Sequence, residues 1–153
     1  MSTYPVHDLA ESKLRILAVP AFNDNYIWLV TDGQRAVVVD PGSAEAAIAA
    51  LKETRLKLEA ILLTHHQADH IGGVPGLLDF ANGQTANPVQ VIGPDDARIP
   101  HITHRTHDGE RFSLLDGQLQ LSTLSVPGHT ETHVAYLSDA VLFCGDTLFS
   151  AGC

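Results

Sequence analysis

The chain has 153 residues and a formal net charge of −9, and its nine histidines equal its lysines and arginines together. The negative charge argues against a nucleic-acid partner, which would be bound through phosphate contacts. No stretch approaches the roughly 18 apolar residues of a membrane helix. The N-terminus lacks a signal-peptide pattern, and two cysteines cannot build a disulfide framework. These features predict a cytoplasmic, globular protein with no membrane partner, and they leave its oligomeric state unknown.

The first part of the chain predicts strands followed by one helix. Three apolar, β-branched or aromatic runs are expected to be strands: Leu14–Val19, Tyr26–Thr31 and Ala36–Val39. Turns are expected at Asn23–Asn25 and Asp32–Gly33. Ser43 is the expected N-cap of a helix over Ala44–Thr54. Four residues of that helix share one apolar face: Ala44, Ala47, Ile48 and Leu51.

The rest of the chain predicts short strands around one short helix. Gly72, Gly73 and Pro75 open the helix, which continues through Leu77–Phe80, and Pro94–Gly109 is expected to be a loop. Six runs are expected to be strands: Ala60–Leu63, Val89–Ile92, Phe112–Leu115, Leu119–Val126, Val134–Leu137 and Ala140–Cys144. No helix or cap is expected after the last strand, so we expect its outer face to lack a covering layer.

Metal-ligating residue types follow three of the predicted strands. The segment Thr64–Gly73 reads Thr-His-His-Gln-Ala-Asp-His-Ile-Gly-Gly and contains His65, Asp69 and His70. His129 follows the strand ending at Val126, and Asp146 follows the strand ending at Cys144. Nitrogen and oxygen ligands of this kind suit a divalent cation of zinc type. A carboxylate such as Asp146 can bridge two cations about 3.5–4 Å apart, as in two-metal hydrolases. The alternative is that all five are ordinary surface or capping residues.

These residues resemble the metal-binding signature of the metallo-β-lactamase fold. Within that superfamily, the sequence is most similar to glyoxalase II, the hydroxyacylglutathione hydrolases. The segments that carry the resemblance are Pro20–Trp28, Val39–Gly42, His65–His70, Pro127–Thr130 and Phe143–Cys153. The resemblance implies an α/β fold, the layered αββα sandwich, of which this chain supplies the first half and part of the second sheet. It implies one domain over residues 1–153, apparently truncated, without the family's C-terminal helical substrate-binding domain.

The resemblance also implies a reaction and a set of roles. The family hydrolyses the thioester S-D-lactoylglutathione to D-lactate and glutathione, in methylglyoxal detoxification, by means of a metal-bridging hydroxide. Two Zn²⁺ ions are implied, with iron or manganese as alternatives. His65 and His129 belong to the first metal, and Asp69 and His70 belong to the second. Asp146 bridges the two metals, and Asp69 also orients the hydroxide, so that Asp69 and Asp146 are the catalytic residues.

The chain departs from the family pattern in two ways. Position 67 is a histidine ligand of the first metal in the family, and here it is Gln67. A neutral amide oxygen is a poorer zinc ligand than imidazole, so we expect a weakened first site. The chain also ends at Cys153, before the family's remaining second-metal histidine and its glutathione-binding basic residue. We therefore expect activity to need residues beyond 153, even if Gln67 is replaced by histidine.

Two other functions remain as alternatives. His65, His129 and Asp146 form a two-histidine, one-carboxylate set that can hold iron(II), as in the persulfide dioxygenases of the same fold. The other alternative is a homologue without activity. Several further residues are interpreted as structural. His101, His104 and His107 are expected on the surface, Cys144 as a small buried residue, Tyr26 and Trp28 in the core, and Asp40 as a loop anchor.

Overall fold

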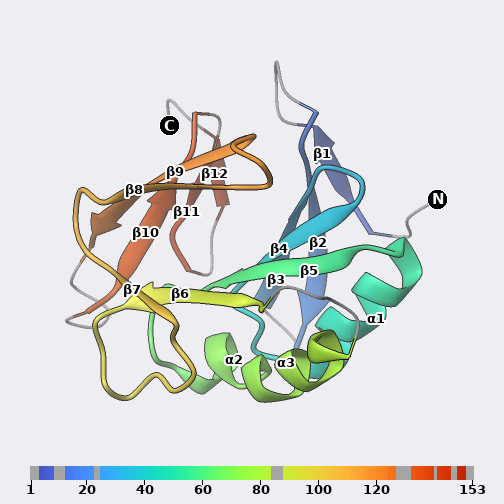
Figure 1. Cartoon of the computed structure of the whole chain (residues 1–153), viewed down its shortest axis with the longest axis horizontal. Coiled ribbons are helices and arrows are strands. Elements are labelled where there is room, and N and C mark those ends of the chain that lie inside the picture. The colour runs from blue at the N-terminus through green and yellow to red at the C-terminus, as the bar shows by residue number, and fades with distance from the viewer. Residues whose placement is uncertain are drawn as a thin grey trace.

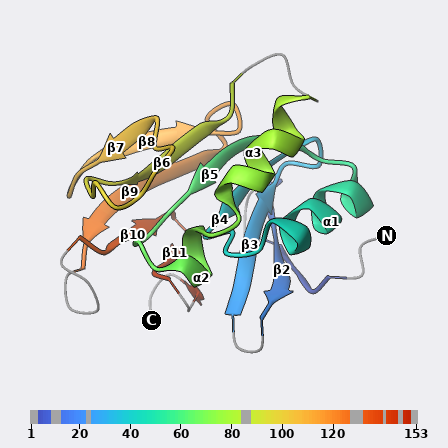
Figure 2. The ribbon, with the colours of Figure 1, turned by 90° about the horizontal axis from the view of Figure 1, so that it is seen from below.

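Two β-sheets pack face to face, and helices cover the outer face of one of them (Figures 1 and 2). The computed structural model describes residues 4–8, 13–22, 25–83, 88–126, 132–139 and 141–145, together with the backbone of 148–150. This arrangement confirms the predicted α/β sandwich. Within those ranges no helix is long and apolar enough to cross a lipid bilayer.

Sheet A is half antiparallel and half parallel. Its strands lie in chain order: β1 (Val6–Asp8), β2 (Arg15–Ala21), β3 (Asn25–Thr31), β4 (Arg35–Val39), β5 (Lys57–Leu62), β6 (Gln90–Pro94) and β7 (His104–Thr106). Pairing is antiparallel from β1 to β4 and parallel from β4 to β7. Parallel neighbours need a crossover connection, and helix α1 provides the one between β4 and β5. The carboxyl ends of β4, β5 and β6 therefore lie together at one edge.

The helices pack on one face of sheet A. They are α1 (Ala44–Thr54), the single turn α2 (Ala68–Ile71) and α3 (Val74–Asn82). Ser43 caps α1 as predicted, because its hydroxyl accepts a hydrogen bond from the backbone N–H of Ala46 at 3.2 Å. The buried face of α1 consists of Ala47, Ala50 and Leu51, whereas the predicted members Ala44 and Ile48 are only half-buried. These residues and α3 form the first hydrophobic core with sheet A.

Sheet B is antiparallel throughout and carries the second half of the chain. Its order is β12 (Leu148–Ser150), β11 (Val141–Phe143), β10 (Val134–Leu137), β9 (Leu119–Ser125) and β8 (Arg111–Leu114). Its inner face packs against sheet A, with Tyr136, Phe143 and Leu121 meeting Trp28 and Val39. This second core joins the sheets and contains Trp28, as predicted. The prediction of a core position for Tyr26 was wrong, because its ring is exposed and stacks on Trp28 from outside.

Four short elements differ from the sequence predictions. Strand β7 lies inside the segment predicted to be a loop, and β12 follows the strand predicted to be last. Strand β1 and helix α2 were also not predicted. None of the four exceeds four residues, so their own sequences carry little periodicity. The three strands form because an existing sheet edge offers backbone hydrogen-bond partners.

Tyr136 links the two sheets close to the histidine segment. Its side chain is fully buried, and its hydroxyl donates a hydrogen bond to the backbone oxygen of Leu63 at 2.6 Å. Leu63 directly precedes Thr64 and His65. The position of sheet B relative to the end of β5 thus depends on a buried polar contact as well as on apolar packing.

We predict that Tyr136→Phe lowers the free energy of unfolding by about 1–3 kcal/mol, because it leaves a buried carbonyl without this donor. Urea denaturation measures the loss. Tyr26→Phe, at a half-exposed ring, is the matched control and should change stability by less than about 0.5 kcal/mol. Equal stabilities for the two variants would contradict the role of the hydroxyl.

Candidate metal centre

The polar residues of interest follow the carboxyl ends of the parallel strands. Asp40 follows β4, Thr64 and His65 follow β5, and Asp96 follows β6. In open α/β sheets, ligands bind outside this edge. All four side chains are buried, with exposed fractions between 0 and 5%. A buried polar cluster of this kind requires internal hydrogen bonds.

Asp40 organises the cluster. Its Oδ1 accepts a hydrogen bond from the backbone N–H of Thr64 at 2.8 Å. Its Oδ2 accepts one from the Thr64 hydroxyl at 2.6 Å and lies 3.1 Å from Nδ1 of His70. Asp40 has a φ of 51°, in the left-handed region, so the backbone is strained in order to turn this carboxylate inward. The predicted role of Asp40 as a loop anchor is confirmed.

These contacts determine which nitrogen of each histidine carries the proton. Because the only hydroxyl proton of Thr64 is donated to Asp40, the Thr64 oxygen must accept from Nδ1 of His65, which lies 2.8 Å away. The Asp40 carboxylate likewise accepts from Nδ1 of His70. Both imidazoles therefore carry a proton on Nδ1, and in the neutral form of each ring Nε2 is the lone-pair donor.

The surroundings of His65 keep its ring neutral. Burial, with a smaller contribution from the nearby His70 and His133 rings, lowers its pKa to about 4 against the opposing effects of Asp40 and Gln67. The ring of His65 lies 4.2 Å from that of His70 and stacks on that of His133 at 4.5 Å. A neutral imidazole is the form that binds a metal.

Asp69 lies beside the two histidines on helix α2. Its Oδ2 accepts a hydrogen bond from the Asn25 side chain at 3.0 Å and lies 3.6 Å from Nε2 of His70. Burial raises the pKa of Asp69, but the Asn25 hydrogen bond and the neighbouring histidines outweigh this effect and lower it. Gly42 permits this position of α2, because a Cβ there would lie 1.9 Å from the carbonyl oxygen of Asp69.

Three of the five predicted ligands are thus brought together, and Gln67 lies with them. Oε1 of Gln67 is 3.2 Å from Nε2 of His65. The other two predicted ligands, His129 and Asp146, lie outside the described residues, as do Asn23 and Asp24 of the predicted turn. Gly145, directly before Asp146, packs against the ring of His133, and a Cβ on it would also come within 3.7 Å of His65.

His133 is a residue that sequence reasoning missed. It is buried, it precedes β10, and its ring stacks on His65 with an angle of 16° between the planes. It follows His129 by four positions, and this histidine spacing behind a predicted strand was the available signal. Its contact with His65 makes it part of the environment that keeps His65 neutral.

The donor set suits a divalent cation. Asp40, His65 and His70 offer ligand atoms within 4.8 Å of one another. The oxygens of Asp40, however, already accept hydrogen bonds from Thr64 and His70, so Asp40 orients the ligands. The atoms directed into the site are Nε2 of His65, Nε2 of His70 and Oδ2 of Asp69. Imidazole nitrogens with a carboxylate oxygen are ligands that zinc and related metals accept.

Three further described histidines and the described cysteine were interpreted from the sequence as structural residues. His101 and His107 are exposed, and His104 is half exposed and paired with Glu110, which confirms the predicted surface positions. Cys144 is half-buried, so the prediction of a buried residue was wrong. It directly follows the short strand β11, and its side chain is partly exposed to solvent.

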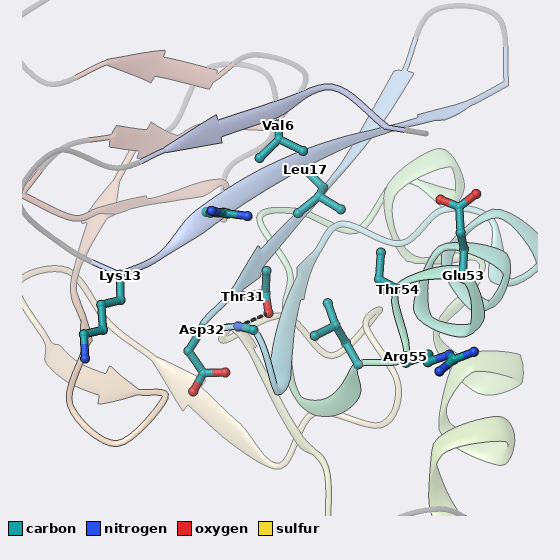
Figure 3. A pocket seen from close by; sticks show the side chains of 11 residues that line it. Val6, Lys13, Leu17, Thr31, Asp32, Glu53, Thr54 and Arg55 are labelled. Carbon is teal, nitrogen blue, oxygen red and sulfur yellow. Dashed lines mark hydrogen bonds between the residues drawn. The ribbon is translucent and has the colours of Figure 1, made fainter. Parts of the chain in front are cut away.

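A pocket lies at the other end of sheet A (Figure 3). Its lining includes Lys13 and Arg15 at the start of β2, Thr31–Gly33 at the end of β3, and Glu53–Leu56 at the end of α1. No histidine or cysteine is among the described residues that line it. Since β3 runs from Asn25 beside Asp69 to Thr31 in this pocket, the pocket and the metal centre lie at opposite ends of the sheet.

Asp96 connects the site to the start of β10. Its carboxylate accepts hydrogen bonds from Nε and Nη2 of Arg98, at 2.9 and 2.7 Å, and from the hydroxyl of Thr132 at 2.6 Å. Nδ1 of His66 lies 3.8 Å away. The hydrogen bonds from Arg98 lower the pKa of Asp96 most strongly, burial opposes them, and Thr132 adds to the lowering. Through this last hydrogen bond Asp96 holds Thr132, the residue directly before His133.

Comparison with known proteins identifies relatives. The family model described as "Metallo-beta-lactamase superfamily" matches residues 21–153. The chain is 51% identical over 142 residues to a hydroxyacylglutathione hydrolase of Aliivibrio fischeri, covering 92% of this chain and 53% of the relative. It is 48% identical over 141 residues to one of Vibrio cholerae, with the same coverage. The chain thus spans about half the length of these curated relatives.

Solved structures share the fold. The B3 metallo-beta-lactamase BLEG-1 superposes with a TM-score of 0.71 at 28% identity, covering 88% of this chain and 73% of that one. The protein ETHE1 of Myxococcus xanthus superposes with a TM-score of 0.65 at 25% identity, covering 82% and 55%. These matches confirm the sandwich predicted from the sequence.

We predict that Asp96→Asn lowers the free energy of unfolding by about 1–3 kcal/mol at neutral pH, because a neutral amide binds Arg98 less strongly. The folded-state pKa of Asp96 is lowered, so its stabilisation is present above the unfolded pKa of about 3.9 and is lost as the pH falls further. The difference between wild type and variant should therefore narrow below about pH 4. Urea denaturation at several pH values measures this difference in the free energy of unfolding. The control is Asp95→Asn, at an exposed carboxylate. A difference that is constant with pH would contradict the ionised pairing.

Proposed function

We propose that this chain, which belongs to the metallo-beta-lactamase superfamily, carries the metal-binding residues of a hydroxyacylglutathione hydrolase. The reaction is hydrolysis of the thioester S-D-lactoylglutathione to D-lactate and glutathione. One observation carries the proposal: a single buried carboxylate, Asp40, orients His70 directly and His65 through Thr64, and Nε2 of His70 lies 3.6 Å from the half-exposed Asp69. The names of the relatives at about half sequence identity support the substrate class.

The proposed centre holds two divalent cations, zinc or alternatively iron or manganese. His65, with His129 and Gln67, would hold the first cation, and Asp69 and His70 would hold the second. Asp146 would bridge them. Bound cations of this type lower the pKa of a water molecule toward 7 and polarise a carbonyl oxygen. The roles of His129 and Asp146 follow from the family pattern alone.

The residues of the chain itself would position and deprotonate water. Hydrolysis adds a water oxygen to the acyl carbon, breaks the carbon–sulfur bond and transfers a proton to the leaving thiolate. Asp69 is ionised at neutral pH because its pKa is lowered, and Asn25 fixes one of its oxygens. Its carboxylate is therefore suited to accept a hydrogen bond from the attacking water. His65 and His70, held through Nδ1, cannot rotate away from the reacting centre.

A mononuclear iron persulfide dioxygenase is the alternative. It would use His65, His129 and Asp146 on a glutathione persulfide and would consume oxygen. This chemistry needs neither Asp69 nor His70, whereas both side chains are directed into the site here. The arrangement of those two residues favours the hydrolase.

The first test measures hydrolysis of S-D-lactoylglutathione by the chain after incubation with Zn²⁺ or Mn²⁺. Because activity is expected to need residues beyond 153, we expect metal-dependent release of glutathione once the segment that the relatives carry beyond this position is fused to the chain. His70→Ala should abolish this release, and His107→Ala, at an exposed histidine, should leave it unchanged. Oxygen uptake with glutathione persulfide and iron, without thioester hydrolysis, would instead establish the dioxygenase. Neither activity with any metal would overturn the proposal for this chain.

A second prediction concerns Asp40. We expect Asp40→Asn to weaken Zn²⁺ binding about 10–100-fold, because His70 loses its carboxylate acceptor and Thr64, which holds His65, loses the same carboxylate. Thr64→Val, which removes only the link to His65, should cause a smaller loss, and exposed Asp79→Asn should cause none. Equilibrium dialysis with metal analysis gives the affinities. Unchanged affinity in both Asp40→Asn and Thr64→Val would rule out the orienting role.

A further inference from the structure

We infer that Gln67 is an amide-oxygen ligand which shifts the first metal position of this chain away from zinc and toward an oxygen-preferring divalent cation such as Mn²⁺. The inference rests on the metal centre of the proposed function and goes beyond it, because it assigns the chemical preference of one position. It concerns His65 and Gln67, both of which the structure describes.

The distance between the side chains of His65 and Gln67 carries the inference. Oε1 of Gln67 lies 3.2 Å from Nε2 of His65. Nε2 carries no proton, because Nδ1 is the donor to Thr64. With the proton on Nδ1, the lone pairs of Nε2 and Oε1 can both be directed at a cation that lies between them. Two donors each about 2.1 Å from a common ion lie roughly 3.0–3.4 Å apart when the angle at the ion is about 90–110°. The observed distance fits that geometry.

The helix-capping role of residue 67 is performed by its backbone. Gln67 is the N-cap residue of α2, and its carbonyl oxygen accepts hydrogen bonds from the N–H groups of His70 at 2.9 Å and Ile71 at 3.1 Å. Its side chain makes no capping hydrogen bond to the helix. A glutamine has no advantage as an N-cap, for which serine, threonine, asparagine and aspartate are preferred. The amide is directed to the metal centre instead.

The chemistry of the amide sets the direction of the preference. Imidazole nitrogen suits zinc and copper, whereas carbonyl and carboxylate oxygens suit magnesium, calcium and manganese. A site with one imidazole fewer and one amide oxygen more loses more affinity for Zn²⁺ than for Mn²⁺. Zn²⁺ can still bind more tightly than Mn²⁺ in absolute terms. The informative quantity is therefore the ratio of the Zn²⁺ and Mn²⁺ dissociation constants.

The experiment compares the Zn²⁺ and Mn²⁺ dissociation constants of four proteins by competition with a metallochromic indicator. They are the wild type, Gln67→His, Gln67→Ala and the control Gln90→His, an exposed residue at the far end of β6. We expect Gln67→His to tighten Zn²⁺ binding at least tenfold and to change Mn²⁺ binding less than threefold. Gln67→Ala should weaken Mn²⁺ binding at least threefold, and the control should change neither constant.

Three results would overturn the inference: equal changes for both metals in Gln67→His, unchanged Mn²⁺ binding in Gln67→Ala, or tighter binding of both metals in Gln67→Ala. The last would mean that the amide only blocks Nε2 of His65. If Gln67→His does not fold, Gln67→Glu replaces it in the test. This variant keeps an oxygen ligand at position 67, so the inference requires that it retain or strengthen Mn²⁺ binding. These constants are independent of thioester hydrolysis, so failure of the proposed reaction and failure of this inference are distinguishable.

Discussion

The buried carboxylate of Asp40 is the interaction on which the rest of the site depends. It accepts two hydrogen bonds from Thr64 and one from His70, and through Thr64 it also fixes the ring of His65. One acidic side chain thereby sets the protonated nitrogen and the orientation of two potential metal ligands. Burying such a group is costly unless it is fully hydrogen-bonded. The left-handed backbone of Asp40 is part of that cost.

The fold supplies the rigidity that this arrangement needs. The carboxyl ends of three parallel strands bring Asp40, Thr64 and Asp96 to one edge. The second sheet is attached at the same edge by the hydrogen bond from Tyr136 to Leu63. The absence of a side chain at Gly42 lets α2 pack against the β4–α1 connection, so that Asp69 lies beside His70. The histidines are therefore held by contacts from both sheets and from the helical layer.

Much of this was predictable from the sequence, and the remainder depends on long-range contacts. The helix over Ala44–Thr54 was predicted with its cap because propensity, periodicity and Ser43 all agree. His65, Asp69 and His70 were recognisable as a cluster from their spacing behind a strand. Strand β7 and helix α2 were not, because elements this short are defined by their partners. The stacking of His133 on His65 joins residues 68 positions apart, and no local pattern contains it.

The most direct test of the account is the protonation of His65 and His70 in the metal-free chain, measured by long-range ¹H–¹⁵N NMR correlation of the imidazole rings at neutral pH. The account predicts that both rings are neutral and carry the proton on Nδ1. Nε2-protonated rings in both residues would contradict it, because the lone pairs would then face Thr64 and Asp40 and no metal ligand would be presented.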